Sequence, residues 1–376
     1  MNQLVRLAAI TLAFGACGDD GGNGGGGLDD AAPVVAKYAE NVYANYGEAL
    51  TTATQLEAAV DAFVATPNET TLGAARTAWL AAREPYGLSE SYRFYDGPID
   101  NPDDGPEGQI NAWPLDEVYI DYVEGNATGG LVNDPSMPIT KELLASRNEE
   151  GGEKNIATGY HAIEFLLWGQ DLSDDGPGAR PATDYTTKSN FERRKQYLAT
   201  VTELLVDDLT TVKDAWMPQS TYTAELIAAK PEESVRRMLQ GMGALGGAEL
   251  SGERMTTAYD NMDQEDEHSC FSDNTHRDLR ANAIAVQNVY LGKYGNSDGM
   301  GIDDLVKTRD PALATRLTEE LAASVAAVEA ISPPFDQALT SETERPKILA
   351  AVRALQKQTE TVVEVATLLG ITLNLE

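Results

Sequence analysis

The sequence predicts an all-α protein built from two bundles of helices. Apolar side chains recur at steps of three and four from about residue 31 to near the end of the 376-residue chain, as they do on one face of a helix. No stretch shows the sustained alternation of apolar and polar residues that marks a half-buried strand. Proline and glycine divide the helical pattern into segments, so we expect amphipathic helices joined by loops.

In the first part of the chain, the helical pattern stops repeatedly at proline. Pro67 ends the first expected helix and Pro85 the second. Prolines are also dense between residues 94 and 114, which predicts an irregular loop there. The expected helices cover residues 31–64, 72–83, 115–123, 139–147 and 155–168.

The polar segment Asp171–Pro181 predicts a boundary between an N-terminal helical half, residues 31–180, and a C-terminal half, residues 181–376. The motif Asn-Val-Tyr followed by Tyr-Gly begins at residue 41 and recurs from residue 288. This echo suggests two related halves, although such short matches also arise by chance. The expected helices of the second half cover residues 187–216, 232–262, 275–293, 311–331 and 344–369.

The N-terminus has the features of a bacterial lipoprotein signal. Arg6 precedes a ten-residue apolar run, which is too short to span a bilayer. The tetrapeptide ending at Cys17 resembles a lipobox, where the signal is cut before a lipidated cysteine. We expect residues 1–16 to be a signal peptide and residues 17–30 to be the lipidated cysteine with a Gly-rich tether. Phe14 replaces the usual leucine, which leaves ordinary secretion as the alternative.

Composition restricts the possible functions further. The chain has 60 acidic and 28 basic residues, and its net charge of −32 repels nucleic acid and attracts cations. Its two cysteines, Cys17 and Cys270, cannot form a disulfide framework or a cysteine-based zinc site. Any chemistry that uses histidine must involve His161, His268 or His276.

His161 and Glu164 form the strongest candidate site. They are three residues apart and therefore share one face of a helix. Glu164 is the polar exception within the apolar run 162–168, so we expect both side chains to be buried. A buried carboxylate is costly unless it is paired, protonated or bound to a metal. The pair is therefore either a structural hydrogen bond or part of a metal site.

The segment 265–276 contains the other two histidines. Asp273 lies just before the next expected helix, where it could cap the helix or bind a metal. His276 continues the apolar stripe of that helix, so we expect it on the packed side. His268 lies in a polar loop, which makes it a weaker candidate.

Two further segments place acidic and basic residues together. Glu249 continues the apolar stripe of the helix 232–262, with Arg254 nearby, and is either a ligand or half of a charge pair. Glu90 lies in a segment rich in tryptophan and tyrosine. The other charged residues of that segment are Arg83, Arg93 and Asp100, each of which could form a surface salt bridge. The two arginines could instead hold the acidic groups of a site or bind an anion.

Together these segments resemble the imelysin, or iron-regulated protein A, family. The resemblance is carried by Gly-Tyr-His161-Ala-Ile-Glu164-Phe-Leu-Leu-Trp-Gly and by the segments 267–276, 93–100 and 111–117. It implies two four-helix-bundle-like halves related by pseudo-symmetry, a cell-envelope location and a link to iron. In related iron-uptake lipoproteins, the His-x-x-Glu motif is implicated in metal binding. Some members of the family carry a metallopeptidase label.

We therefore expect an envelope-anchored lipoprotein that binds a metal for iron uptake or homeostasis. It would be lipid-anchored at the periplasmic face or in the outer membrane, and an envelope iron-transport protein would be its partner. Imidazole and carboxylate ligands suit iron, and zinc also fits. The expected ligands are His161 and Glu164 first, then Glu249, His276, Asp273 and Glu90. The expected supporting residues are Arg83, Arg93, Asp100, Arg254 and His268.

Two other functions remain open from the sequence. One is a metallopeptidase with a metal on His161, Glu164 and His276, in which Glu249 activates water. The other is a lipoprotein that binds or scaffolds without a metal, in which the charged cluster only joins the two halves. We expect a binding protein rather than an enzyme.

Overall fold

The computed structural model describes residues 28–173 and 176–375. Most of these residues are helical, which confirms the predicted all-α fold. Within the described chain, the strands are limited to a short antiparallel hairpin of β1 (Lys293–Tyr294) and β2 (Ser297–Asp298). None of the described helices is long and apolar enough to cross a membrane. The predicted signal peptide and Cys17 lie outside the described residues.

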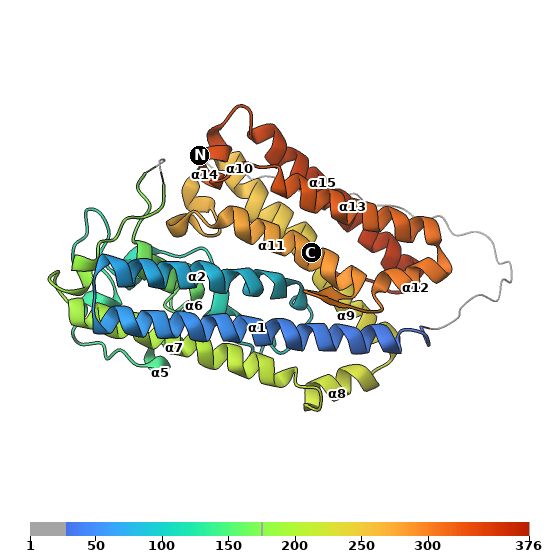
Figure 1. The fold of residues 1–376 in the computed structure, drawn as a ribbon, viewed down its shortest axis with the longest axis horizontal. Coiled ribbons are helices and arrows are strands. Elements are labelled where there is room, and N and C mark those ends of the chain that lie inside the picture. The colour runs from blue at the N-terminus through green and yellow to red at the C-terminus, as the bar shows by residue number, and fades with distance from the viewer. Residues whose placement is uncertain (1–27, 174–175, 376) are drawn as a thin grey trace.

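Four helices pack against one another as a first group, which forms the lower layer in Figure 1. The group consists of α1 (Ala32–Ala65), α2 (Glu69–Ser89), α6 (Gly159–Trp168) and α7 (Phe191–Ala215). The connection from α2 to α6 is long and carries short helices. These are η1 (Glu90–Tyr92), α3 (Glu107–Asn111), α4 (Glu117–Ile120), η2 (Leu131–Asn133) and α5 (Lys141–Arg147).

A second group packs beside the first, and its helices α11, α13 and α15 form the upper layer in Figure 1. The group consists of η4 (Leu245–Thr256), α11 (Thr275–Leu291), α13 (Pro311–Glu329) and α15 (Arg345–Leu368). The remaining elements are η3 (Ala182–Tyr185), α8 (Thr221–Ala228), α9 (Pro231–Ala244), α10 (Thr257–Asn261), η5 (Gln264–Asp266), η6 (Cys270–Ser272), α12 (Ile302–Arg309) and α14 (Phe335–Thr340).

The two groups meet where α2 packs on α11. One apolar cluster runs through both groups, from Trp79 on α2 to Val286 on α11 and Val362 on α15. The pseudo-symmetry of the halves stays a prediction. The repeated Asn-Val-Tyr motif lies on α1 and α11, which are the first helix of one group and the second helix of the other.

The groups do not divide at the predicted boundary. Helix α7 follows residue 180 in the sequence, yet it packs on α1 and α6 of the first group. Its buried side chains include Leu198, Val201 and Leu205, which join the same apolar cluster. The first group therefore continues to the end of α7, because tertiary packing rather than the polar segment decides which helices belong together.

Two proline-based expectations also differ from the structure. Helix α2 continues through Pro85 to Ser89, although proline removes one backbone hydrogen bond from the helix. The carbonyl of Pro85 accepts a hydrogen bond from Asn45 of α1, and Tyr86 beside it is fully buried. Packing therefore maintains this turn. The loop 94–114 is also not wholly irregular, because it contains α3.

The expected helix 232–262 consists of three consecutive segments, α9, η4 and α10. The middle segment, η4, is a π-helix, which has more residues per turn than an α-helix. The wider turn shifts the side chains out of the 3.6-residue period. As a result Glu249, which was expected on the buried stripe, is 27% exposed.

Candidate functional site

The candidate site begins with α6, which is buried along its whole length. The helix starts at Gly159, whose φ of +82° favours glycine. A Cβ atom at this position would lie 2.4 Å from the carbonyl oxygen of Ile110. Helix α6 ends at Trp168, and Gly169, which follows it, also has a positive φ. These glycines let α6 pack tightly and hold His161 and Glu164 in the interior.

His161 and Glu164 lie on one face of α6, as their spacing predicts, and they contact each other. His161 Nδ1 lies 2.9 Å from Glu164 Oε2. The other carboxylate oxygen, Oε1, accepts hydrogen bonds from the backbone N–H of Ser272 at 3.0 Å and from its hydroxyl at 2.6 Å. Both oxygens of Glu164 are therefore engaged. In contrast, His161 Nε2 is buried and has no hydrogen-bond partner among the described residues.

Burial dominates the protonation of this pair. It raises the pKa of Glu164 well above its usual value, although the hydrogen bonds from Ser272 oppose the shift. It lowers the pKa of His161, and the nearby His268 and Arg83 lower it further. His161 is therefore uncharged at neutral pH. When Nδ1–H donates to an ionised Glu164, Nε2 carries a free lone pair.

A second histidine–carboxylate pair lies beside the first. His268 Nδ1 is 3.2 Å from Asp278 Oδ2, which also accepts a hydrogen bond from the Ser269 hydroxyl. Asp278 forms an ion pair with Arg83, with 3.2 Å between Nη2 and Oδ2. Arg83 also donates to Asn111 at 2.5 Å. Asp278 thus connects α11, α2 and the loop that carries His268.

The predicted ligands Glu90 and Glu249 are held by arginine. Arg254 donates from Nη1 to Glu90 Oε1 at 3.0 Å and from Nη2 to Glu90 Oε2 at 2.5 Å. It also donates to Glu249 at 2.9 Å. Burial alone would raise the pKa of Glu90, but the charge and hydrogen bonds of Arg254 lower it to about 2. Glu249 therefore forms an ion pair with Arg254, which is one of the two roles that the sequence left open for it.

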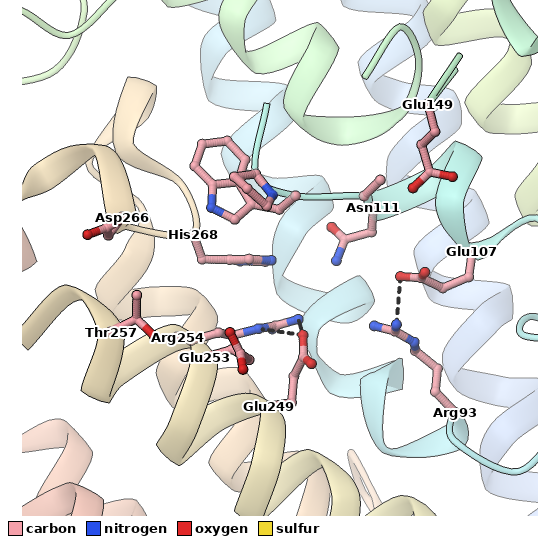
Figure 2. Close-up of a pocket in the computed structure, with 13 residues that line it drawn as sticks. Arg93, Glu107, Asn111, Glu149, Glu249, Glu253, Arg254, Thr257, Asp266 and His268 are labelled. Atoms are coloured by element: carbon pink, nitrogen blue, oxygen red, sulfur yellow. Dashed lines mark hydrogen bonds and ion pairs between the residues drawn. The ribbon is translucent and has the colours of Figure 1, made fainter. Parts of the chain in front are cut away.

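A pocket of about 330 Å³ lies next to these clusters (Figure 2). Trp113 and His268 line it, and both rings also contact the ring of His161, with centroid separations of 4.9 and 4.7 Å. The charged residues around the pocket are mainly acidic. They are Glu107, Glu149, Glu249, Glu253 and Asp266, together with Arg93 and Arg254.

Comparisons with known proteins agree with this fold. The sequence profile of a family described as imelysin, peptidase M75, matches residues 42–362. The chain belongs to the imelysin family. The predicted resemblance is thus confirmed.

One curated relative of this imelysin is iron-regulated protein A of Synechococcus elongatus, which is 26% identical over 94% of the chain and 89% of the relative. A crystal structure of a Parabacteroides distasonis protein classed as an iron-regulated protein A precursor matches with a TM-score of 0.69 and 21% identity, covering 90% of this chain and 95% of that one. An imelysin-like protein from Psychrobacter arcticum matches with a TM-score of 0.63 and 14% identity, covering 90% and 96%. At these identities, the two structures support the fold alone.

Three other predicted residues of this imelysin make contacts with groups outside the His161 pair. His276 is half-buried, and it is therefore less buried than the apolar stripe predicted. Its Nδ1 contacts the carbonyl of Asp273. The pKa of Asp273 is raised to about 7 by burial and by neighbouring carboxylates. Asp100 accepts hydrogen bonds from the backbone N–H groups of Phe94, Tyr95 and Gly97, and therefore holds a turn.

Some important residues of the site were not singled out by the sequence. Ser269, Ser272, Asn111 and Trp113 lie within the motifs that carry the family resemblance, so the motif boundaries could have identified them. Asp278 carries no such local signal, because its role depends on Arg83 from a distant helix. In the described part of the chain, no group of three or more His, Cys, Asp or Glu side chains is arranged to hold a metal ion.

Proposed function

We propose that this imelysin binds iron in the cell envelope, with His161 as the principal ligand. The observation that carries the proposal is the uncommitted Nε2 of His161, a buried ring nitrogen without a hydrogen-bond partner among the described residues. A buried polar atom of this kind is costly, and a bound metal ion would remove the cost. The relative named iron-regulated protein A supports a role related to iron.

Glu164 has a different role in this proposal from the one that its spacing suggested. Its oxygens already accept hydrogen bonds from His161 and Ser272. In its ionised form, which a nearby cation favours, Glu164 accepts a hydrogen bond from Nδ1–H of His161 and orients the ring, which leaves Nε2 for the metal. Metal-binding histidines commonly donate their second ring N–H to a carboxylate in this way. Imidazole is a suitable ligand for iron and also for zinc.

The pocket supplies the approach to this ligand. Its rim has more carboxylates than arginines, and the whole chain has a net charge of −32. A cleft lined by negative charge attracts cations and raises their local concentration. Trp113 and His268 line the pocket and contact the ring of His161, so an ion would reach His161 Nε2 beside these two rings.

Metal titration of protein prepared without chelator tests the proposal. We expect Fe²⁺ to bind wild type under anaerobic conditions, with Zn²⁺ as a competitor, and His161→Ala to lose at least tenfold in affinity. His276→Ala is the matched control, since it removes a half-buried histidine outside the pair, and it should bind like wild type. Wild type that binds neither metal at micromolar concentration, or a His161→Ala variant that binds as wild type does, would overturn the proposal.

The envelope location has its own test. We propose that Cys17 is lipidated, because a short apolar run and a lipobox-like tetrapeptide precede it and a Gly-rich tether follows it. The mature protein should then partition into detergent, and Cys17→Ser should abolish this behaviour. A wild-type protein that remains in the aqueous phase after cleavage at another position would contradict the anchor.

A further inference from the structure

We infer that His268 is a second imidazole ligand of the same metal ion, and that Asp278 orients it. This inference rests on the proposed function, because it concerns the ion held by His161. The sequence placed His268 in a polar loop, but the structure buries it to 3% exposure against the ring of His161. The two histidines come from different parts of the fold, α6 in the first group and the loop before α11 of the second.

The two histidines have equivalent surroundings. In each, Nδ1 faces a carboxylate, Glu164 for His161 and Asp278 for His268. In each, that carboxylate also accepts a hydrogen bond from a serine hydroxyl of the same short segment. These serines are Ser269 and Ser272. Since Nδ1 is used in both rings, Nε2 is the nitrogen that each ring can offer to a metal.

The separation of the rings suits shared coordination. Metal–imidazole bonds are about 2.0–2.1 Å long, so two imidazoles on neighbouring positions of one ion have ring centres roughly 4–6 Å apart. The centroids of His161 and His268 are 4.7 Å apart, and their planes are inclined by 78°. An edge-to-face contact alone would have a similar geometry, but it would leave the buried His161 Nε2 without a hydrogen-bond partner among the described residues.

The support behind His268 is more rigid than a loop position suggests. Asp278 is fixed by two contacts from Arg83, each at 3.2 Å, and by Asn274 at 3.3 Å. Arg83 is itself buried and lies over the ring of Tyr160, the residue before His161. These contacts restrain the orienting carboxylate and, through it, the ring of His268.

His268 also lies on the side of the proposed ion that faces the pocket. Its ring points into the pocket in Figure 2, whereas His161 is not among the residues that line the pocket. The pocket volume of about 330 Å³ has room for water or another small ligand on the metal. An ion shared by the two rings would thus be anchored at His161 and accessible beside His268.

The experiment counts imidazole ligands directly. The protein is loaded with Cu²⁺ as a paramagnetic probe, and the coordinated imidazoles are counted by electron spin echo envelope modulation. Wild type should show two, His268→Ala one, and the matched control His276→Ala two. In parallel, Fe²⁺ affinity should fall at least tenfold in His268→Ala and remain unchanged in His276→Ala. Circular dichroism of the metal-free variants separates loss of a ligand from loss of the fold.

A subtler variant covers the case in which His268→Ala fails to fold. Ser269→Ala removes one hydrogen bond to Asp278 and keeps both histidines, so two imidazoles should remain while Fe²⁺ affinity falls severalfold. One imidazole in wild type, with Fe²⁺ binding that depends on His161 alone, would overturn the inference and leave the proposed function intact. Absence of Fe²⁺ binding by wild type would overturn both.

Discussion

Two buried polar clusters of this imelysin show what distinguishes a structural site from a candidate metal site. In the cluster around Asp121, the carboxylate accepts hydrogen bonds from Arg180 and from Arg194, at distances of 2.6 to 2.9 Å. In the His161 cluster, Glu164 is equally well bonded. Burial and a saturated carboxylate are therefore common to both clusters.

The difference lies in the partner of the carboxylate. Arginine is always protonated and has no lone pair to offer a metal, so Asp121 and its arginines can only hold the fold together. Histidine that donates from one ring nitrogen keeps a lone pair on the other. A buried carboxylate by itself is therefore not evidence for a metal site. An uncommitted ring nitrogen beside the carboxylate is the more informative feature.

The largest expected effect is the loss of protein stability when the Asp121 cluster is disrupted. Asp121→Asn should lower the free energy of unfolding by about 3–5 kcal/mol, because it leaves two buried arginines without their shared carboxylate. Urea unfolding followed by circular dichroism measures the change. Fe²⁺ affinity of the folded variant should stay at the wild-type level. A stability loss below about 1 kcal/mol would show that the Asp121 cluster contributes little to holding the fold together.

The next effect concerns the pH dependence of the Glu90–Arg254 pair. The folded-state pKa of Glu90, about 2, is below its value in the unfolded chain, so the pair stabilises the fold above about pH 4.5. This stabilisation disappears as the pH falls toward 2. At about 1.4 kcal/mol per pKa unit, Glu90→Gln should cost roughly 3 kcal/mol at pH 7.

The measurement is the difference in unfolding free energy between wild type and Glu90→Gln at pH 7, 4.5 and 3. This difference should be nearly constant at the two higher values and should shrink at the lowest. A difference that grows on acidification would mean that Glu90 is not held ionised by Arg254.

A smaller effect is expected at Ser272. Ser272→Ala removes the hydroxyl that donates to Glu164 and leaves the backbone N–H of the same residue in place. Stability should fall by roughly 1–3 kcal/mol and Fe²⁺ affinity by up to about tenfold, because Glu164 orients the metal-binding ring less firmly. Ser146→Ala, on the exposed side of α5, is the matched control and should change neither quantity. Unaltered affinity in Ser272→Ala would mean that the orientation of Glu164 does not control binding.

The smallest effect is expected at Glu249. Glu249→Gln removes the negative charge of one partly exposed ion pair, while Arg254 keeps both of its hydrogen bonds to Glu90. Stability should change by about 1 kcal/mol or less, and Fe²⁺ affinity should hardly change. Calorimetric titration measures both the stoichiometry and the affinity. A large loss of Fe²⁺ binding would restore Glu249 as a ligand and would weaken the contrast between paired and uncommitted groups.

Much of the site followed from local sequence. The spacing of His161 and Glu164, together with their apolar neighbours, predicted two buried side chains on one face of a helix, and the structure adds that they are in direct contact. The glycine that opens α6 is explained by its backbone angle and by the closeness of Ile110. These features are local because they depend on helix geometry and on the residues within one or two turns.

Other parts of the site depended on distant segments. The sequence ranked His268 below His276 because His268 lies in a polar loop. The structure reverses their burial, since the loop is enclosed between Trp113 and Asp278 while His276 remains half-exposed at the start of α11. The spacing of apolar residues along one helix carries no information about contacts with distant segments.

The sequence by itself determined the all-α class, most of the long helices and the His161–Glu164 pair, because these depend on interactions within a few residues. Only the tertiary structure decided that α7 belongs with the first group, that Arg254 neutralises Glu90, and that His268 lies against His161. Each of these contacts joins segments far apart in the chain. Their formation depends on how the helices pack, and the free energy of packing is shared across the whole core rather than encoded at one position.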